Sequence, residues 1–427
     1  METTESYLAR KFEELNLLND CLGSPSSLVC PRSVNEVIKR KFQLTASIRA
    51  EHELQDWTAT ETAWADPDIG VAGPFKFRYD YQRADLDVQG PSFYELGEEF
   101  TQETVYTGSG MAAISALLLA SARVLGQAEV LVLPGTYGET LELIDGYARH
   151  LRKVILKGKI VDQGQAEKRR ILLLDFCTPA GTFENMLGNS GRGLDLIIFD
   201  TTCFAAGSGR IRRVLRWAGQ WNIPTVMVRS HNKLDSLGAE YGRLGSASFV
   251  NQTKSDLRAR RFELTELLSE TKTAIRLFGG AALPAHFPPF IGTDVYRSLT
   301  NRRVAAIVRN GRRTTRYFNS ALKGRIREIQ FTHGLYVTLS STRPLDEAAA
   351  RSAAAKMSED LAQEGFPIRH AGSFGFDFAA TEWSHDVLTD GYSVRFAVPD
   401  LPTKLWDDLT KAVATWWVLN NPGAVGT

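Results

Sequence analysis

Four short runs of apolar residues, separated by helical patterns, constrain the fold of this chain more than any other feature. The runs are Val130–Leu133, Ile171–Leu174, Leu196–Phe199 and Thr225–Val228. Strands that are apolar on both faces are typical of parallel sheets that helices cover on each side. The sequence therefore predicts an α/β fold with a mainly parallel sheet.

Helical patterns surround these runs and continue toward the C-terminus. Within the α/β region they cover 112–125, 140–151, 211–221 and 254–277. Beyond it, helices and strands alternate, with helices at 298–322, 346–364 and from 402, and strands at 335–339 and 392–398. We therefore expect a helical N-terminal segment (1–75), a large α/β domain (76–297) and a smaller C-terminal α+β domain (298–427).

The helix expected at 298–322 is rich in arginine. Its six arginines are Arg302, Arg303, Arg309, Arg312, Arg313 and Arg316. A group of like charges on one helix is most often a solvated face. We therefore expect these side chains to face solvent or a second subunit.

The charge balance and the cysteines argue against several classes of protein. The 427 residues include 50 Lys and Arg and 49 Asp and Glu, so we expect no nucleic-acid partner. The four cysteines form no CxxC pair, so we expect neither a disulfide framework nor a metal site. Because the sequence shows neither a signal-peptide pattern nor an uncharged apolar stretch of about 18 residues, we expect a cytoplasmic protein without membrane association.

Chemistry-bearing residues stand where the predicted strands and turns end, which is where open parallel sheets bind their ligands. The glycine fingerprints of dinucleotide and P-loop sites are absent from these positions. Instead, the small residues of Thr107–Met111 open the helix 112–125, where free N–H groups suit a phosphate. The alternative is a plain glycine turn in which Ser109 caps the helix.

Three further residues follow predicted strands. Tyr137 can lie flat against a planar ligand, or it can pack over a tight turn. Asp200 is a carboxylate that needs a partner such as a pyridinium nitrogen, or it caps the turn that follows; Asp175 is the next candidate for this role. Lys233, in Ser230-His231-Asn232-Lys233, is either a Schiff-base lysine in the crevice or a surface lysine.

In their order along the chain, these residues resemble the fold-type-I pyridoxal-phosphate enzymes. The resemblance is strongest to the cysteine/methionine-metabolism family of cystathionine γ-synthase, cystathionine γ-lyase and methionine γ-lyase. The family's Ser-Gly-Met-Ala-Ala-Ile motif is identical to Ser109–Ile114. Other family motifs are similar to Tyr81-Gln82-Arg83, Tyr137-Gly138-Glu139-Thr140, Asp200-Thr201-Thr202, Ser230-His231-Asn232-Lys233, Ser373-Phe374-Gly375 and Val394-Arg395-Phe396. The N-terminal segment has no counterpart in this resemblance.

The resemblance implies a pyridoxal 5'-phosphate cofactor and a set of residue roles. Lys233 would form the Schiff base and move the Cα proton, Asp200 would keep the ring nitrogen protonated, and Tyr137 would stack on the ring. The other cofactor-binding residues would be Ser109, Gly110, Met111, Thr202, Ser230 and Asn232, with Tyr81 and Arg83 of the partner subunit. Arg395 and Ser373 would bind the substrate. The protein would then be a homodimer or homotetramer with shared active sites.

The chain departs from the family pattern at several positions, and the reaction stays open among three classes. Cys177-Thr178-Pro179-Ala180-Gly181 stands where the family has Glu-Thr-Pro-x-Asn-Pro, so the Asn that would bond the ring hydroxyl has no counterpart. The resemblance implies Cα deprotonation of an amino acid, followed by γ- or β-elimination or replacement. The alternatives are an aminotransferase, which uses the same lysine, and a non-catalytic pyridoxal-phosphate-binding regulator.

Overall fold

The chain forms two compact units in the computed structural model. The structure describes residues 1–55, 70–78, 87–156, 160, 168–175, 177–252, 264–332, 334–386, 391–420 and 422. Unit 1 comprises Met1–Ile48, Lys233–Glu240 and Thr293–Thr427, and unit 2 comprises Arg49–Asn232 and Tyr241–Gly292. This division differs from the boundaries that the sequence suggests, because the first 48 residues pack with the C-terminal part of the chain in one unit.

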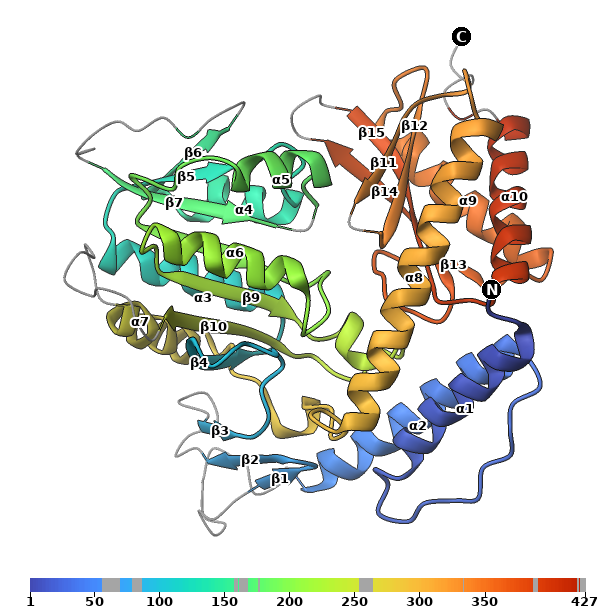
Figure 1. The fold of residues 1–427 in the computed structure, drawn as a ribbon, viewed down its shortest axis with the longest axis horizontal. Coiled ribbons are helices and arrows are strands. Elements are labelled where there is room, and N and C mark those ends of the chain that lie inside the picture. The colour runs from blue at the N-terminus through green and yellow to red at the C-terminus, as the bar shows by residue number, and fades with distance from the viewer. Residues whose placement is uncertain are drawn as a thin grey trace. The chain divides into compact units, whose positions relative to one another are not determined.

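A seven-stranded sheet forms the centre of unit 2 (Figure 1). Its strands, in the order β4-β10-β9-β8-β7-β5-β6, are β4 (Phe100–Thr107), β10 (Gly245–Gln252), β9 (Thr225–Ser230), β8 (Leu196–Asp200), β7 (Arg169–Leu174), β5 (Ala128–Val132) and β6 (Leu151–Ile155). The strands from β9 to β6 are parallel, whereas β10 is antiparallel to both β9 and β4. The prediction of an α/β fold with a mainly parallel sheet is confirmed.

Helices cover both faces of this sheet. They are α3 (Gly110–Val124), α4 (Gly138–Tyr147), α5 (Ala180–Leu187), α6 (Gly209–Gln220) and α7 (Leu264–Phe278). In β5, Val130 and Val132 pack into the core that contains α3, α4 and α7, whereas Leu131 packs into the core of α5 and α6. Successive side chains of a strand point to opposite faces, so a strand covered on both faces must be apolar at every position. This double burial explains the four continuous apolar runs.

A small antiparallel sheet also belongs to unit 2. Its strands are β1 (Gly70–Ala72), β2 (Phe75–Arg78) and β3 (Asp87–Gln89), paired in that order. Phe75 and Phe77 of β2 pack against Phe287, with ring centroids 5.1 and 4.8 Å apart. The sequence patterns did not predict these short strands.

The described residues of unit 1 form a five-stranded sheet and five α-helices. In the order β11-β12-β15-β14-β13, the strands are β11 (Ile326–Thr332), β12 (Tyr336–Ser341), β15 (Gly391–Ala397), β14 (Ala379–Asp386) and β13 (Ile368–His370). The helices are α1 (Thr4–Asn19), α2 (Val34–Gln55), which continues into unit 2, α8 (Asp294–Ala321), α9 (Glu347–Gln363) and α10 (Thr403–Asn420). The smaller α+β part expected near the C-terminus is confirmed.

The first helix is fixed at its start by local hydrogen bonds. The Thr3 hydroxyl accepts from the Ser6 N–H at 3.1 Å, and the Ser6 hydroxyl accepts from the Thr3 N–H at 3.0 Å. This capping box satisfies two N–H groups that the helix itself leaves unpaired, so α1 begins at Thr4. The Glu2 N–H also donates to the Thr403 hydroxyl at 3.2 Å, which ties the chain start to α10.

The expectation of a solvated arginine face on α8 is wrong for Arg303. Its side chain is 2% exposed and lies among buried carboxylates. Arg302 and Arg313 do reach the surface, where they pair with Glu13 and Asp407 at 2.5 Å each. The reason is helical geometry, because one face of an amphipathic helix turns inward whatever residues it carries.

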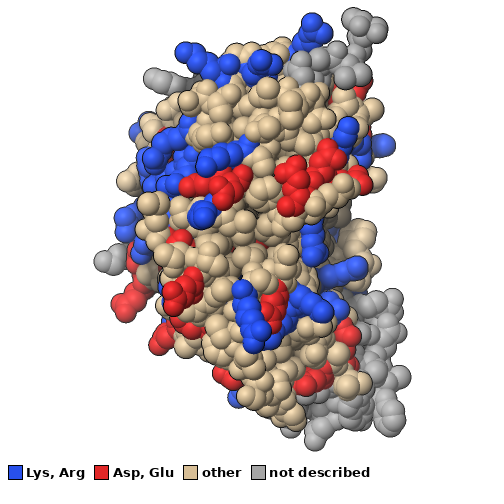
Figure 2. Space-filling model, turned by 90° about the vertical axis from the view of Figure 1, so that its right-hand side faces the viewer, with Lys and Arg blue, Asp and Glu red and all other residues tan. Residues whose placement is uncertain are grey.

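Charged side chains of both signs are mixed on one face of the molecule. Figure 2 shows a face on which small groups of Lys and Arg alternate with small groups of Asp and Glu. In the described part of the chain, no helix is long and apolar enough to cross a membrane.

Candidate functional site

The start of α3 lies directly against the ends of two strands of the unit 2 sheet. The Ser109 hydroxyl accepts from the Ala112 N–H at 3.0 Å and so caps the helix. A Cβ on Gly110 would lie 3.0 Å from the Ser230 Cβ, and a Cβ on Gly245 would lie 2.1 Å from the Ser109 carbonyl carbon. Only glycine permits this approach at residue 245. The cap uses the N–H of Ala112 and not those of Gly110 and Met111, which suit an anion. The cap and the phosphate interpretation are therefore compatible.

Thr202 connects the ends of β8 and β9. Its hydroxyl accepts from the Ser230 N–H at 3.0 Å, while its own N–H donates to Asp200 Oδ1 at 2.8 Å. Asp200 is 6% exposed at the end of β8. Its carboxylate therefore caps the turn, as the alternative interpretation held, and the chain keeps a buried acid at the carboxyl end of the sheet. Four predicted residues, Ser109, Gly110, Thr202 and Ser230, meet at this edge.

Asp175 holds the loop that carries Tyr137. Asp175 Oδ2 accepts from the Tyr137 N–H at 2.6 Å, and Oδ1 accepts from the N–H groups of Cys177 and Thr178 at 2.8 and 3.2 Å. Burial, and after it the nearby Asp200 carboxylate, raise the pKa of the Asp175 carboxyl to about 7, although its backbone hydrogen bonds act in the opposite direction. The Asp175 carboxyl therefore titrates near neutral pH, next to a second acid.

His231 and Asn232 begin the connection that leads from β9 to β10. The His231 ring lies 3.9 Å from the Phe93 ring centre, and its Nε2 lies 2.8 Å from the Ser246 hydroxyl. The Asn232 side chain accepts from the Leu244 N–H at 3.4 Å. Both side chains thus hold the connection that leads into Lys233.

Unit 1 brings Lys233, Ser373 and Arg395 together through an aromatic pair. Lys233 Nζ donates to the Ser373 hydroxyl and lies 5.6 Å from the Phe374 ring centre. The Phe374 ring packs edge-to-face on the Tyr336 ring at 5.0 Å. The Arg395 guanidinium in turn lies 5.5 Å from the Tyr336 ring centre. The Lys233 amine and the Arg395 guanidinium therefore lie on either side of the Phe374–Tyr336 ring pair.

The adjacent strands explain how Arg395 and Tyr336 meet. In the pairing of β12 with β15, Tyr336 is opposite Ala397 and Thr338 is opposite Arg395. Residues diagonal across an antiparallel pair are within reach of long side chains. Tyr336 was missed in the sequence, where it belongs to a predicted strand but to no matched motif. The sequence signal that could have pointed to Tyr336 is its place as an aromatic residue at the start of β12.

The residues of unit 2 fit a phosphorylated, cationic aromatic group. The α3 start offers N–H donors to an anion, Asp200 offers a buried carboxylate to a ring cation, and Tyr137 offers an aromatic face. A Cβ on Gly108 or on Gly138 would meet no atom within 4 Å, so space is open beside both loops. Tyr81 and Arg83, the residues expected to come from a partner subunit, lie outside the described residues.

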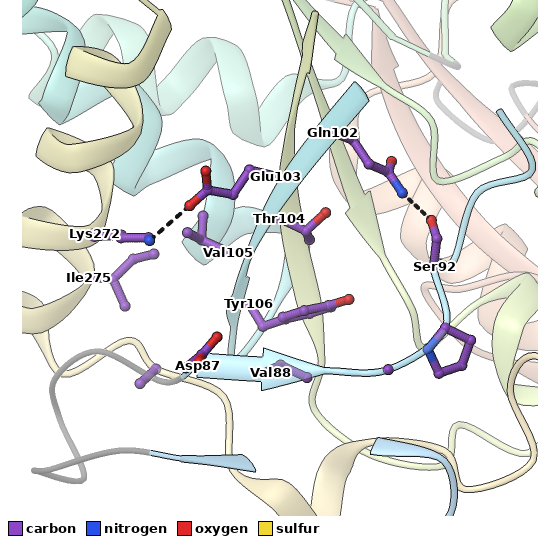
Figure 3. A pocket seen from close by; sticks show the side chains of 13 residues that line it. Asp87, Val88, Ser92, Gln102, Glu103, Thr104, Val105, Tyr106, Lys272 and Ile275 are labelled. Carbon is purple, nitrogen blue, oxygen red and sulfur yellow. Dashed lines mark hydrogen bonds and ion pairs between the residues drawn. The ribbon is translucent and has the colours of Figure 1, made fainter. Parts of the chain in front are cut away.

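A pocket of about 350 Å³ lies elsewhere in unit 2, along β4. Figure 3 shows Gln102, Thr104 and Tyr106 on one side of the strand, and Glu103 on the other, where Lys272 donates to it at 3.0 Å. None of the candidate site residues described in the preceding paragraphs lines this pocket. It is therefore separate from the strand ends that carry the candidate site.

Comparisons with known proteins establish the fold. No protein-family model matches the chain, and no curated protein sequence matches it. Cystathionine γ-synthase from Xanthomonas oryzae pv. oryzae in complex with cystathionine is similar in structure, with a TM-score of 0.53 and 15% identity over 87% of this chain and 98% of that chain. The same enzyme in complex with aminoacrylate and cysteine gives a TM-score of 0.48 and 16% identity, over 74% and 82%. The first likeness confirms the fold-type-I architecture expected from the sequence.

Proposed function

We propose that this chain is a pyridoxal-phosphate-dependent enzyme that removes the Cα proton of an amino acid and then eliminates or replaces a group on its side chain. The observation that carries the proposal is the arrangement of Lys233, Ser373 and Arg395 in unit 1. A lysine held by a hydroxyl, with a guanidinium at the other end of an aromatic pair, suits a substrate that carries an amine and a carboxylate.

The cofactor would be held by the residues at the strand ends of unit 2 and attached to Lys233, which follows Asn232 in the chain. The N–H groups of Gly110 and Met111, with the hydroxyls of Ser109, Thr202 and Ser230, are the phosphate donors in this proposal. When bound, pyridoxal phosphate would supply an electron sink for the negative charge that develops at Cα.

Asp200 and Asp175 act on the ring nitrogen in this proposal. The buried Asp200 carboxylate keeps a proton on that nitrogen, because a paired buried charge costs far less than an unpaired one. The pKa of the Asp175 carboxyl is raised to about 7, in part by Asp200, and the same carboxyl accepts from the Tyr137 N–H, so it would hold the loop that presents Tyr137 to the ring. Because the sequence lacks the family's ring-hydroxyl Asn, these acids and Tyr137 would be the groups that orient the ring.

Two residues of unit 1 act on the substrate. The Arg395 guanidinium binds the α-carboxylate with two parallel N–H donors, a geometry that a lysine does not offer. The Lys233 amine would take the proton from Cα and pass a proton to the side-chain group, which departs with the electron pair of its bond. The Ser373 hydroxyl holds Nζ in place. As the resemblance implies, Tyr81 and Arg83 of the partner subunit complete the phosphate site in an oligomer.

The experiment begins with the cofactor. Purified protein mixed with pyridoxal phosphate should develop a visible absorbance band, and borohydride should fix the cofactor on the Lys233 peptide, as mass spectrometry can show. A panel of amino acids with O-substituted or γ-halogenated side chains should then yield ammonia and a 2-oxo acid, or a replacement product, without an added amino acceptor. Attachment to another lysine, or turnover only with an added 2-oxo acid, contradicts the proposal.

A further inference from the structure

A cluster of charged side chains is buried under the N-terminal helices of unit 1. This cluster, the buried ion cluster, consists of Arg10, Lys11 and Glu14 from α1, Lys41 from α2, Arg303 from α8, and Asp377 and Asp400 from loops. Their side chains are between 0% and 5% exposed. The cluster is unusual because Lys and Arg are rarely buried so fully.

Two lysines from the N-terminal helices are central to the cluster. Lys11 Nζ lies 2.7 Å from Asp377, 2.8 Å from Asp400 and 3.0 Å from Glu14. Lys41 Nζ lies 2.5 Å from Asp377 and also pairs with Glu14. Burial of ions is costly, and an apolar core of similar volume is often at least as stable. Stability alone therefore does not explain the cluster, and a role in fixing one arrangement of neighbouring groups does.

The cluster holds the two loops that carry Lys233 and Ser373. Lys41 Nζ donates to the Leu237 carbonyl at 2.8 Å, and Arg303 Nη2 donates to the Gly375 carbonyl at 2.7 Å. These carbonyls lie four residues after Lys233 and two residues after Ser373. Both contacts are charge-assisted hydrogen bonds to loop backbone, which are stronger than neutral ones.

The loops fit against the cluster and against each other without spare room. A Cβ on Gly238, where φ is +90°, would lie 2.7 Å from Arg303 Nη2 and 2.9 Å from Asp377 Oδ1. A Cβ on Gly375, where φ is +87°, would lie 3.0 Å from the Lys233 carbonyl carbon. A displacement of the cluster therefore displaces both loops.

We propose that the N-terminal helices, through Lys11 and Lys41, position the Lys233 amine against Ser373. Lys41 acts on the Lys233 loop through Leu237, and both lysines act on the Ser373 loop through Asp377 and its partner Arg303. Lys11 and Lys41 are thus positioning residues in a segment that has no counterpart in the family motifs. Their importance for turnover rests on the proposed function, whereas their hold on the loops does not.

The test compares Lys41→Met with Lys39→Met, an exposed lysine on the same helix. Without any cofactor, amide hydrogen exchange in peptides spanning 233–240 and 372–378 should be about tenfold faster in Lys41→Met, and within about twofold of wild type in Lys39→Met. Equal exchange in the two variants overturns the inference. This measurement needs no cofactor, so it tests the positioning role even if the wild-type protein binds none. A lack of cofactor binding would contradict only the proposed function.

A second readout separates positioning from a general loss of structure. Lys41→Met should slow the attachment of pyridoxal phosphate to Lys233 about tenfold, since an amine held less firmly reacts less often. The affinity for pyridoxamine 5'-phosphate, which cannot attach to a lysine, should stay within about twofold of wild type, because its binding depends on unit 2. An equal loss for both compounds shows a general defect and contradicts a positioning role.

If Lys41→Met does not fold, the wild-type protein still tests the inference. Native-state hydrogen exchange in increasing urea should show that the loop peptides lose protection together with the α1 and α2 peptides. Loop protection that persists after α1 and α2 have exchanged overturns the inference.

Discussion

Lys233 donates a hydrogen bond from Nζ to the hydroxyl of Ser373, which lies 140 residues further along the chain. The Phe374 ring, beside Ser373, gives the same amine an aromatic neighbour at 5.6 Å. Neither contact is an ion pair, so in the described part of the chain a hydroxyl and an aromatic ring hold the amine. The predictions below rest on this pair and on the groups around it.

Ser373→Ala should lower kcat about tenfold and leave the attached cofactor in place, because the lost hydrogen bond is worth roughly 1.5 kcal/mol. Ser373→Thr keeps the hydroxyl and should retain most of the activity. Steady-state kinetics and the visible absorbance of the cofactor measure the two effects. Unchanged kcat in Ser373→Ala would mean that the hydroxyl does not orient Lys233.

Asp200→Asn should keep the cofactor on Lys233 but lower kcat by a factor of at least ~100, because the electron sink is needed mainly in the transition state. Asp175→Asn should have a smaller effect on kcat, since Asp175 acts through Tyr137 and Asp200. Steady-state kinetics of both variants at saturating cofactor show which substitution lowers kcat more. If Asp175→Asn proves the more damaging, Asp175 is the acid at the ring nitrogen.

Arg395→Ala should raise KM for the amino acid about 10- to 100-fold, as expected when a charge-assisted pair worth ~1.5–3 kcal/mol is lost. Some loss of kcat should accompany it, because the contact also orients the Cα–H bond. Arg369→Ala is the matched control, an exposed arginine that packs on Phe378 in the same sheet. Similar kinetics for the two variants would show that another group binds the carboxylate.

Tyr336→Leu should raise KM about 3- to 30-fold, since the Arg395 guanidinium loses a cation–π contact worth ~0.5–2 kcal/mol. Tyr336→Phe keeps the ring and should behave like wild type. The comparison needs only initial rates over a range of substrate concentrations. A loss of equal size in both variants would assign the effect to the Tyr336 hydroxyl instead.

Stability should depend on pH through Asp175. A carboxyl whose pKa is raised in the folded protein binds more protons folded than unfolded, so the free energy of unfolding falls as the pH rises from about 4 to about 7. Asp175→Asn removes this titration. Relative to wild type, the variant should therefore gain ~2–4 kcal/mol between pH 4 and pH 8 in urea unfolding, whatever its absolute stability. A constant difference across this range would mean that Asp175 is ionised at pH 4.

The parallel sheet could be predicted from the sequence because its strands are buried on both faces. Val130 and Leu131 pack on opposite sides of the sheet, and both must be apolar. By contrast, β10 has the sequence Gly-Ser-Ala-Ser-Phe-Val-Asn-Gln, which carries no apolar run. It is a strand because its backbone pairs with β9 on one side and β4 on the other, and no local pattern reports such pairing.

The site could be predicted where function depends on local sequence, and not where it depends on distant contacts. The α3 start is recognisable from Ser109–Ile114 alone, since the cap and the glycine approach are local requirements. Lys11 carries no such signal. Its partners Asp377 and Asp400 lie 366 and 389 residues away, and a charged residue is read as exposed until they are known.

The sequence separation within the buried ion cluster also sets an order for folding during synthesis. Unit 2 lies within Arg49–Gly292 and is made before most of unit 1, and domains generally fold as units as the chain emerges. The helices α1 and α2 are made long before Asp400. Lys11 can pair with Asp400 only after the chain has grown by a further 389 residues, because such a distant contact forms late. The amine of Lys233 therefore lacks this support until Asp400 has been made, so a chain that ends before Asp400 would carry the lysine without the contacts that position it.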